Sequence, residues 1–207
     1  MDDLRQTFNT LRKYQLKLNM AKCVFGVSSG KFLGHLVTRR GIEVYPDQIT
    51  SLQSLQSPRT TKEVHKLTSM IAALNFFVSR SSDKCRPFFQ LLRKKAGYVW
   101  GEDREEAFQV MKKYLATPPL ISSPKIEDVL TIYLVVSEHA VSAALIREED
   151  RQQQPVYYIS KTLLDAETRY LPLEKLLLAL VTSSRKLHHY FLAHRIEVPT
   201  VHPWPTF

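Results

Sequence analysis

The chain has 207 residues, of which 44% are hydrophobic and 24% are charged, and this composition is typical of a globular protein rather than a disordered one. No apolar run reaches the ~18 residues that cross a membrane, and two cysteines are too few for a disulfide framework, so we expect an intracellular protein, cytoplasmic or nuclear, with no membrane partner. The net charge of +9 comes from residues 1–100, which hold 17 Lys/Arg against 6 Asp/Glu, and it indicates either a polyanionic partner or a solvated basic face.

The first predicted element is an amphipathic helix near the N-terminus, with apolar residues at helical intervals from Leu4 to Leu18. Asp2 and Asp3 lie in its first turn, where carboxylates complement the helix dipole. The letters MDD also occur in metal-binding turns, but such a turn needs a strand before it. We therefore interpret these acids as the start of a helix.

A β-like run from Phe32 to Thr38 follows and ends at the turn Arg39-Arg40-Gly41. The preceding segment GVSSGK, residues 26–31, resembles a phosphate-binding loop. It is one residue short, and Phe32 replaces the hydroxyl residue that would bind magnesium. We therefore interpret the segment as a turn that leads into a strand.

Two helices are predicted next. The first lies within residues 57–78, because Thr60 and Glu63 form a capping-box pattern and an apolar stripe runs from Val64 to Val78. The second follows WGEDREE, residues 100–106, with Met111 facing inward.

The stretch RPFFQLLRKK, residues 86–95, mixes aromatic and basic side chains. Phe88 and Phe89 could stack on bases while the basic residues contact phosphates. In the alternative, the apolar side chains pack inward and the basic ones stay solvated. The basic members are Arg86, Arg93, Lys94 and Lys95.

The segment TPPLISSP, residues 117–124, is the best linker candidate, because consecutive prolines exclude a helix. Strands are predicted near 129–136, 140–146 and 155–159, with REEDRQQQ as a loop between the last two. A helix begins near Pro172 with an apolar stripe that includes Leu173, Leu176 and Leu177, and a last strand covers 195–199. The order β-β-β-α-β leaves one face of the sheet uncovered, so we expect an incomplete domain.

Four stretches together resemble the Pol polyprotein of gypsy-type LTR retroelements, in a plant-like form. They keep their order across about residues 1–199, and the FLGH segment at 32–35 is among the most specific motifs. The stretches are LRKYQLKLNMAKCVFGVSSGKFLGHLVTRRGIEVYPDQI, TKEVHKLTSMIAALNFFVSRSSDKCRPFFQLLRK, WGEDREEAFQVMKKYLATPPLI and PVYYISKTLLDAETRYLPLEKLLLALVTSSRKLHHYF.

The resemblance implies a mixed α/β (α+β) fold in four parts. Residues 1–45 would be the C-terminal end of a reverse transcriptase palm, with the FLGH segment as a primer-grip hairpin, and 46–116 would be the thumb and connection helices. Residues 117–124 would be a linker, and 125–207 a truncated RNase H-like β-β-β-α-β domain. The parent activities would be RNA-directed DNA synthesis and cleavage of RNA in RNA–DNA hybrids, both with Mg²⁺.

The resemblance also implies partners, which are an RNA–DNA or DNA duplex, bound weakly and without sequence preference, and the remainder of the Pol polyprotein. The residues expected to contact nucleic acid are Lys31, Phe32, Leu33, Gly34, His35, Arg86, Arg93, Lys94 and Lys95.

The chain departs from the family at the positions of the metal-binding carboxylates. The first RNase H carboxylate falls on Val135, the second on Leu176 and the third near Val201, and the polymerase carboxylates would lie before residue 1. Apolar side chains at 135 and 176 would suit a buried sheet–helix interface. We therefore expect no metal cofactor in this chain and a catalytically inactive fragment.

Three nearby acids do not rebuild the metal site, because each stands alone or faces away. They are Glu138, Glu174 and Glu197. In the thumb helix, Ser69 and Phe76 replace a glycine and an arginine of the family, which removes one phosphate contact.

Two rival interpretations stay open. One is a host-recruited interaction module, which an exposed apolar face beside Leu173–Phe191 would favour. The other is a decayed open reading frame with no selected function.

Overall fold

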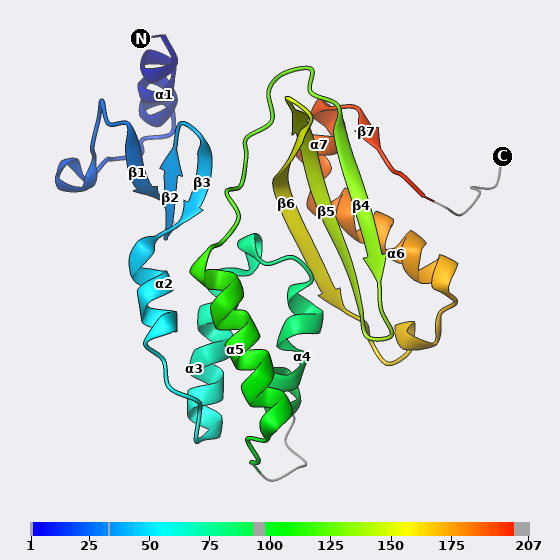
Figure 1. Ribbon diagram of the computed structural model, residues 1–207. Coiled ribbons are helices and arrows are strands. Elements are labelled where there is room, and N and C mark those ends of the chain that lie inside the picture. Colours follow the sequence, from blue (N-terminus) through cyan, green and yellow to red (C-terminus); the bar gives the residue numbers. More distant parts are fainter. Residues whose placement is uncertain (1, 33, 93–97, 201–207) are drawn as a thin grey trace.

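The computed structural model describes residues 2–32, 34–92 and 98–200. It is a mixed α/β structure with a small N-terminal sheet, a group of helices and a larger C-terminal sheet (Figure 1). Within these residues, no helix is long and apolar enough to cross a membrane.

The first helix, α1 (Asp2–Lys13), has Asp2 and Asp3 in its first turn, so the acids open a helix as predicted, while Met1 lies outside the described residues. The helix ends earlier than its apolar stripe, because Gln15 has a φ of 54°. A short 3-10 helix, η1 (Met20–Lys22), follows. None of the residues of α1 is buried.

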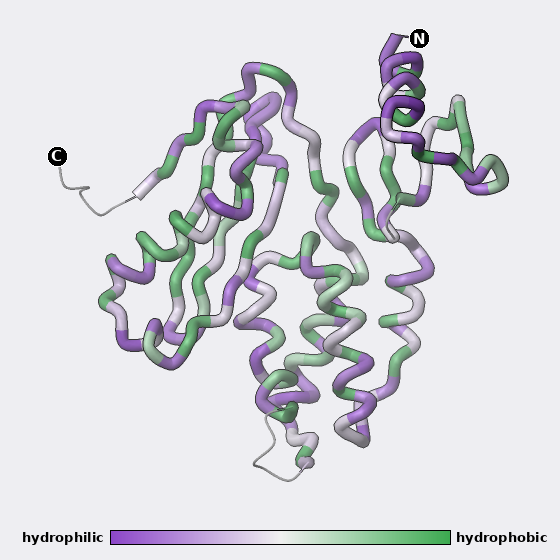
Figure 2. Tube along the Cα trace, turned by 180° about the vertical axis from the view of Figure 1, so that it is seen from behind, coloured by the Kyte–Doolittle hydropathy of each residue, from purple (hydrophilic) through white to green (hydrophobic). Residues whose placement is uncertain are grey.

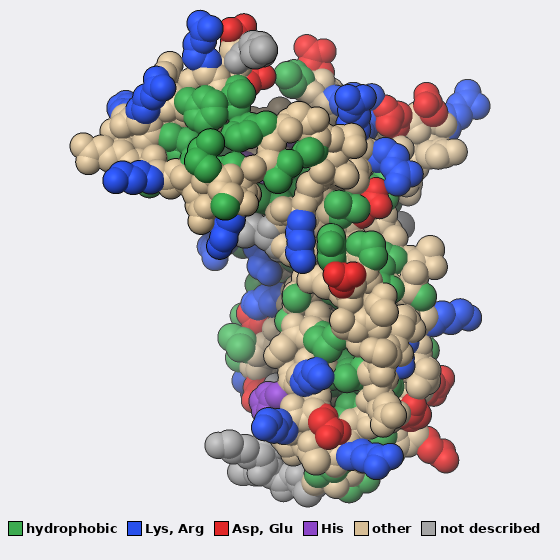
Figure 3. All heavy atoms as spheres, turned by 90° about the vertical axis from the view of Figure 1, so that its left-hand side faces the viewer, with side chains coloured by type: hydrophobic (Ala, Val, Ile, Leu, Met, Phe, Trp, Pro, Cys, Tyr) green, Lys and Arg blue, Asp and Glu red, His purple; other side chains and the backbone are tan. Residues whose placement is uncertain are grey.

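The apolar side chains of this region lie at the surface instead. Figure 3 shows hydrophobic side chains gathered on the upper part of the molecule, with lysines and arginines around them. Those that are more than half exposed are Tyr14, Leu16, Met20, Val24, Phe25, Val27 and Phe32.

The N-terminal sheet has three antiparallel strands, β1 (Ser29–Phe32), β2 (His35–Thr38) and β3 (Gly41–Val44). The segment 26–31 therefore leads into a strand, as predicted. The predicted run from Phe32 to Thr38 is interrupted, because Phe32 pairs with His35 across a turn in which Gly34 has a φ of 84°. Leu33 lies outside the described residues.

The helical part consists of α2 (Pro46–Gln53), α3 (Thr61–Ala73), η2 (Asn75–Phe77), α4 (Ser81–Leu92) and α5 (Glu102–Ala116). The predicted cap of α3 is confirmed, since the Glu63 backbone N–H donates to Thr60 Oγ1 at 3.3 Å. The core of this part contains Val64, Leu67, Ile71, Phe77, Phe88, Phe108, Met111 and Leu115. Phe88 thus packs inward, whereas Phe89 stays 43% exposed.

Lowering the pH below 4.5 is expected to reduce the free energy of unfolding in part through Glu105. Its carboxylate accepts hydrogen bonds from Gln109 Nε2 and Trp100 Nε1, both at 2.7 Å, and they hold the pKa of Glu105 below its usual 4.5. A carboxylate with a depressed folded-state pKa stabilises the fold above its unfolded-state pKa, and this contribution is lost as the pH falls through the folded-state pKa.

Urea denaturation at several pH values measures this effect. Glu105→Gln should flatten the decline of the unfolding free energy below pH 4.5, whereas substitution of the exposed neighbour, Glu106→Gln, should leave the decline unchanged. If the unfolding free energy declines equally with pH in Glu105→Gln and in the unsubstituted chain, Glu105 does not contribute to the acid sensitivity.

The proline-rich segment 117–124 contains no helix, as predicted, and it is fixed at both sides. Ile121 exchanges backbone hydrogen bonds of 2.8 and 3.0 Å with Ile42, which lies in β3 of the small sheet. The Ser122 N–H donates to the carbonyl of Pro155, which lies in the larger sheet, at 2.7 Å. Ile121 and Ser122 are both buried. Residues 121–122 therefore connect the two sheets, and a division into domains at this segment stays a prediction.

The larger sheet contains β4 (Leu130–Val136), β5 (Ala140–Glu149), β6 (Gln152–Thr162) and β7 (Ile196–Glu197) in the order β6-β5-β4-β7, with β7 parallel to β4. Between β6 and β7 lie η3 (Glu167–Arg169), α6 (Pro172–Lys186) and α7 (His188–Ala193). The predicted order β-β-β-α-β is confirmed.

The predicted loop REEDRQQQ is wrong. Its residues extend β5 and β6, and Glu149 pairs with Gln152 around a two-residue turn. Asp150 and Arg151 have φ values of 53° and 61°, which is the positive-φ geometry of a tight hairpin turn. Arg147 at its start is buried, and the residues after it are polar because they extend beyond the core, not because they lack a strand.

The apolar stripe that begins in α6 is buried only in part. Leu187, just after the helix, lies in the core, while Leu173 and Leu177 are 40% and 41% exposed. Within α6 itself the buried residues are Lys175, Ala179 and Ser183. Figure 2 shows hydrophobic residues along both the sheet and α6. Because leucines occur all around this helix, the small Ala179 and Ser183 decide which side lies close to the sheet.

The second face of the sheet is partly covered, contrary to the expectation. α6 packs on β4 and β5, and η2 and α4 pack along β6 (Figure 1). Tyr158 contributes to the helical core, and the Ser82 N–H donates to Ser160 Oγ at 3.0 Å. The helical part therefore supplies the cover that the sheet would otherwise lack.

Candidate nucleic-acid interface

Val135, the position of the first family carboxylate, lies near the end of β4. Its neighbours Leu134 and Val136 pack against the buried cluster that contains Ala179 of α6. Because successive side chains of a strand alternate between faces, Val135 projects from the opposite face, and it is 39% exposed. The predicted buried sheet–helix interface is therefore wrong at this position.

Leu176, the second position, is partly buried and belongs to none of the described core clusters. The preceding residue, Lys175, is 8% exposed, and its ammonium donates to the Glu138 backbone carbonyl at 3.4 Å. The side chain of α6 that reaches the end of β4 thus carries a positive charge. Val201, the third position, lies outside the described residues.

The three neighbouring acids have separate surroundings. The Glu138 side chain is 92% exposed, Glu174 accepts a hydrogen bond from the Leu171 N–H at 2.8 Å and so caps α6, and Glu197 pairs with Arg195 at 3.4 Å. In the described ranges, no group of three or more His, Cys, Asp or Glu residues is placed to hold a metal ion. Of the expected carboxylate positions that lie within the described residues, Val135 and Leu176 offer no oxygen ligand to a magnesium ion.

The β1–β2 hairpin presents its predicted contact residues in different ways. The Lys31 ammonium lies 4.1 Å from the centroid of the Tyr45 ring, and Phe32 is 65% exposed. His35 instead packs inward, with its ring centroid 5.4 Å from that of Phe77. His35 therefore anchors the hairpin on the helical core, and Lys31 and Phe32 face outward.

A cavity of about 460 Å³ lies beside this hairpin. Lys31 of β1 and Lys66 of α3 both line it, together with Tyr45 and Ser69. Two cations from separate elements thus line one concave surface, together with the carboxylate of Asp47. Lys66 was not among the residues predicted from the sequence, although its place on the exposed side of α3, two residues from the buried Val64, could have identified it.

Phe76, at a position where the resemblance implies an arginine, makes aromatic contacts with two other rings. Its ring centroid lies 4.7 Å from that of Tyr157 on β6 and 5.2 Å from that of Phe77. Phe76 therefore connects the helical part to the larger sheet.

Arg86 lies on α4, on a different side of the helical part from the hairpin (Figure 1). The predicted contact residues therefore form two groups rather than one. Lys84 of the same helix is not available as a free cation, because its ammonium lies 3.7 Å from the Tyr114 ring centroid and burial lowers its pKa. Arg93, Lys94 and Lys95 lie outside the described residues.

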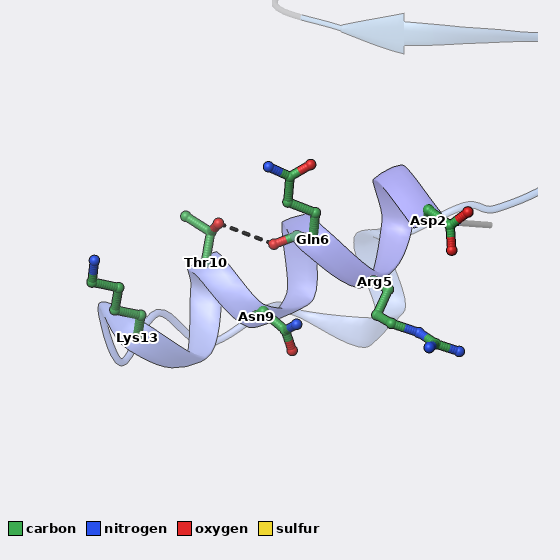
Figure 4. Close-up of a pocket in the computed structure, with 6 residues that line it drawn as sticks. All are labelled: Asp2, Arg5, Gln6, Asn9, Thr10 and Lys13. Carbon is green, nitrogen blue, oxygen red and sulfur yellow. Dashed lines mark hydrogen bonds between the residues drawn. The ribbon is translucent and has the colours of Figure 1, made fainter.

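A second concave surface, of about 420 Å³, lies along the polar side of α1. Figure 4 shows that its side chains all project from this one helix, with Thr10 Oγ1 bonded to the Gln6 carbonyl at 3.0 Å. No other element supplies a labelled side chain, so the groups do not converge on one point. Its residues are Asp2, Arg5, Gln6, Asn9, Thr10 and Lys13.

Comparison with known proteins gives a consistent result. Residues 100–198 match the family described as an RNase H-like domain found in reverse transcriptase. The chain is 27% identical over 203 residues to the retrovirus-related Pol polyprotein from transposon 297 of Drosophila melanogaster, and 25% identical over 188 residues to the transposon Tf2-3 polyprotein of Schizosaccharomyces pombe. These alignments cover 98% and 90% of this chain but 19% and 14% of the relatives, so the chain spans less than a fifth of their length.

Among solved structures, the foamy viral protease–reverse transcriptase in complex with an RNA/DNA hybrid superposes with a TM-score of 0.74 at 20% identity. A dRH form of that protein in complex with double-stranded DNA gives 0.73 at 22% identity. They cover 98% and 94% of this chain, and 28% and 34% of the foamy viral chains. The fold is therefore the mixed α/β fold of these proteins, and residues 100–198 are similar to the RNase H-like domain found in reverse transcriptase.

Proposed function

From this similarity to retrotransposon Pol polyproteins, we propose that the chain corresponds to the palm end, thumb and RNase H-like part of a gypsy-type, plant-like Pol. It binds nucleic-acid duplexes weakly and without sequence preference, and it catalyses neither DNA synthesis nor RNA cleavage. The gypsy-type and plant-like assignment is supported by the sequence motifs at residues 11–49 and 155–191.

The observation that supports binding is the cavity shared by Lys31 and Lys66. Lysines that neutralise phosphates release counterions, and this term supplies most of non-specific affinity. The hairpin and α3 present both cations on one concave surface. The similar foamy viral proteins are seen in complex with double-stranded DNA and with an RNA/DNA hybrid.

The inactive state is supported by the chemistry of the side chains at the carboxylate positions. Two-metal phosphoryl hydrolysis needs carboxylates that hold both ions. Val135 and Leu176 offer none, and the ammonium of Lys175 stands beside the end of β4. A cation at this place opposes the binding of a second one.

Fluorescence anisotropy with a labelled RNA–DNA hybrid tests the binding. For two phosphate contacts, the affinity should fall about tenfold between ~50 and ~200 mM salt, and the slope of log K against log salt should decrease by about 0.9 for each lysine removed in Lys31→Gln and Lys66→Gln. Lys113→Gln, an exposed lysine of α5, is the matched control. Salt-independent binding, or an equal loss in the control, would overturn the proposal.

A nuclease assay on the same hybrid with magnesium tests the inactive state, and the RNA strand should stay intact. Cleavage that Glu138→Gln or Glu197→Gln abolishes would show that the neighbouring acids do rebuild a metal site.

A second candidate, a protein-interaction module, is favoured by the exposed apolar side of α6. Leu173, Leu177 and Val181 lie four residues apart and are 40%, 41% and 44% exposed, which is the spacing of a helical docking stripe. Docking through these residues does not require Lys31 or Lys66, so the lysine variants separate the two candidates.

A further inference from the structure

A cleft of about 660 Å³ lies between α4 and the adjoining ends of β5 and β6. In Figure 1, α4 runs beside the end of β6 from which the chain leaves towards α6. The cleft belongs to neither the hairpin surface nor the family's carboxylate positions. Its chemically distinctive lining residues are Arg86, Phe89, Gln90, His139, Thr162 and Thr168.

The two walls of the cleft are held together by polar contacts. The Ser137 hydroxyl donates to Asp83 Oδ1 at 2.7 Å, and the Ser82 N–H donates to Ser160 Oγ at 3.0 Å. These bonds fix the first turn of α4 against the sheet. The cleft is therefore a preformed site rather than a gap between two independent parts.

One side of α4 supplies three different groups to this cleft. Phe88 is completely buried and stacks on Trp100 with ring centroids 6.0 Å apart, and this packing turns the next residues outward. Arg86, Phe89 and Gln90 are three and four residues apart, so they share one helix face. Phe89 is 43% exposed, which leaves its ring free to stack.

These groups match the parts of one nucleotide. An exposed aromatic ring stacks on a base, a guanidinium binds a phosphate, and amide and hydroxyl groups read base edges. The opposite wall adds His139, which is 38% exposed. Asp165 also lines the cleft, and its carboxylate disfavours an isolated phosphate, so the ligand must gain from stacking as well as from charge.

We infer that this cleft binds an unpaired nucleotide of a single-stranded nucleic acid, with the base against Phe89 and a phosphate at Arg86. A base can use its face and its pairing edge in this way after it leaves the duplex. The inference rests on the proposed nucleic-acid partner but concerns a different surface and a different form of the ligand.

Anisotropy with a labelled short oligothymidylate tests the inference. Phe89→Ala should weaken binding about tenfold or more, because the loss of stacking on one base is large enough for such a change. Binding of the RNA–DNA hybrid should stay unchanged. Tyr14→Ala is the matched control, because it removes an exposed aromatic ring that is distant from Phe89 in the sequence. This variant should bind the oligothymidylate as the unsubstituted chain does.

A second variant and a second ligand separate base stacking from a folding defect and from contact with the phosphate backbone alone. Phe89→Leu keeps the apolar bulk of the side chain but has no ring to stack on a base. It should bind oligothymidylate more weakly than the unsubstituted chain, even if the alanine variant is misfolded. An abasic strand of equal length should bind the unsubstituted chain as weakly as oligothymidylate binds Phe89→Ala.

Normal binding by Phe89→Ala and Phe89→Leu, or equal binding of the abasic strand, would overturn the inference. If the RNA–DNA hybrid does not bind but oligothymidylate still binds in a way that depends on Phe89, the proposed duplex binding is refuted and the inference about the cleft is not.

Discussion

Gly41→Ala is expected to lower the free energy of unfolding by about 3 kcal/mol or more. Gly41 has a φ of 141°, and a Cβ at this position would lie 2.0 Å from the Ile121 carbonyl oxygen and 3.0 Å from its carbon. The obstacle is backbone, which cannot rotate away. Relief of the clash would break the 2.8 Å hydrogen bond from the Ile42 N–H to that oxygen.

Urea denaturation followed by the fluorescence of Trp100, which packs in the helical core, measures this loss. Gly30→Ala is the matched control, because no heavy atom lies within 4 Å of a Cβ there. The control should change the unfolding free energy by less than about 1 kcal/mol. Similar midpoints for the two variants would show that β3 and the segment at Ile121 are not in close contact.

Arg147→Met is expected to lower the free energy of unfolding by about 1–3 kcal/mol, because it removes a buried guanidinium that donates to the buried Ser122. The Arg147 side chain is 6% exposed, and its guanidinium lies 3.1 Å from Asp128 Oδ2 and 3.1 Å from Glu149 Oε1. It also donates to Ser122 Oγ at 3.1 Å. Methionine fills a similar volume but removes the donor to Ser122 Oγ, while Asp128 and Glu149 keep their contacts with Lys125.

The surface pair of Arg195 and Glu197 provides the control for this variant. The Arg195 side chain is 77% exposed, and exposed ion pairs contribute about 0–1 kcal/mol. Arg195→Met should therefore have a small effect in the same urea experiment. If the two methionine variants lose equal stability, the buried network does not hold the 122–128 segment on β5.

The elements that the sequence predicts well are those whose signals are local. The capping pattern of Thr60 and Glu63 and the stripe from Val64 identify α3, and Pro172 opens α6 as expected. The strand order after residue 125 follows from alternating apolar runs. Each of these signals depends on residues within one or two turns of each other.

The predictions that failed concern features without a clear local signal in the sequence. Asp150 and Arg151 form the turn of the β5–β6 hairpin with positive φ angles. Such turns usually contain glycine or asparagine, so the sequence here does not have the usual turn pattern. The buried side of α6 could not be chosen by hydrophobicity, since leucines surround the helix and the selecting residues, Ala179 and Ser183, are small.

The candidate site shows the same division. The mismatch at Val135 and Leu176 stays a prediction from the resemblance, and the β1–β2 hairpin is formed as expected. The sequence alone did not reveal that Lys66 joins Lys31 at one cavity or that Arg86 stands apart from both. Such groupings are set by how α3 and α4 pack, which no local pattern specifies.

The backbone bonds of Ile121 and Ser122 have a consequence for how copies of this chain can diverge. Adjacent residues pair with Ile42 on one side and with Pro155 on the other, so one inserted or deleted residue would put one of the two partners out of register. Length changes should therefore accumulate elsewhere, for example at the exposed turn of Asp150 and Arg151. A segment with the composition of a tolerant connector is thus among the parts of the chain least free to change in length.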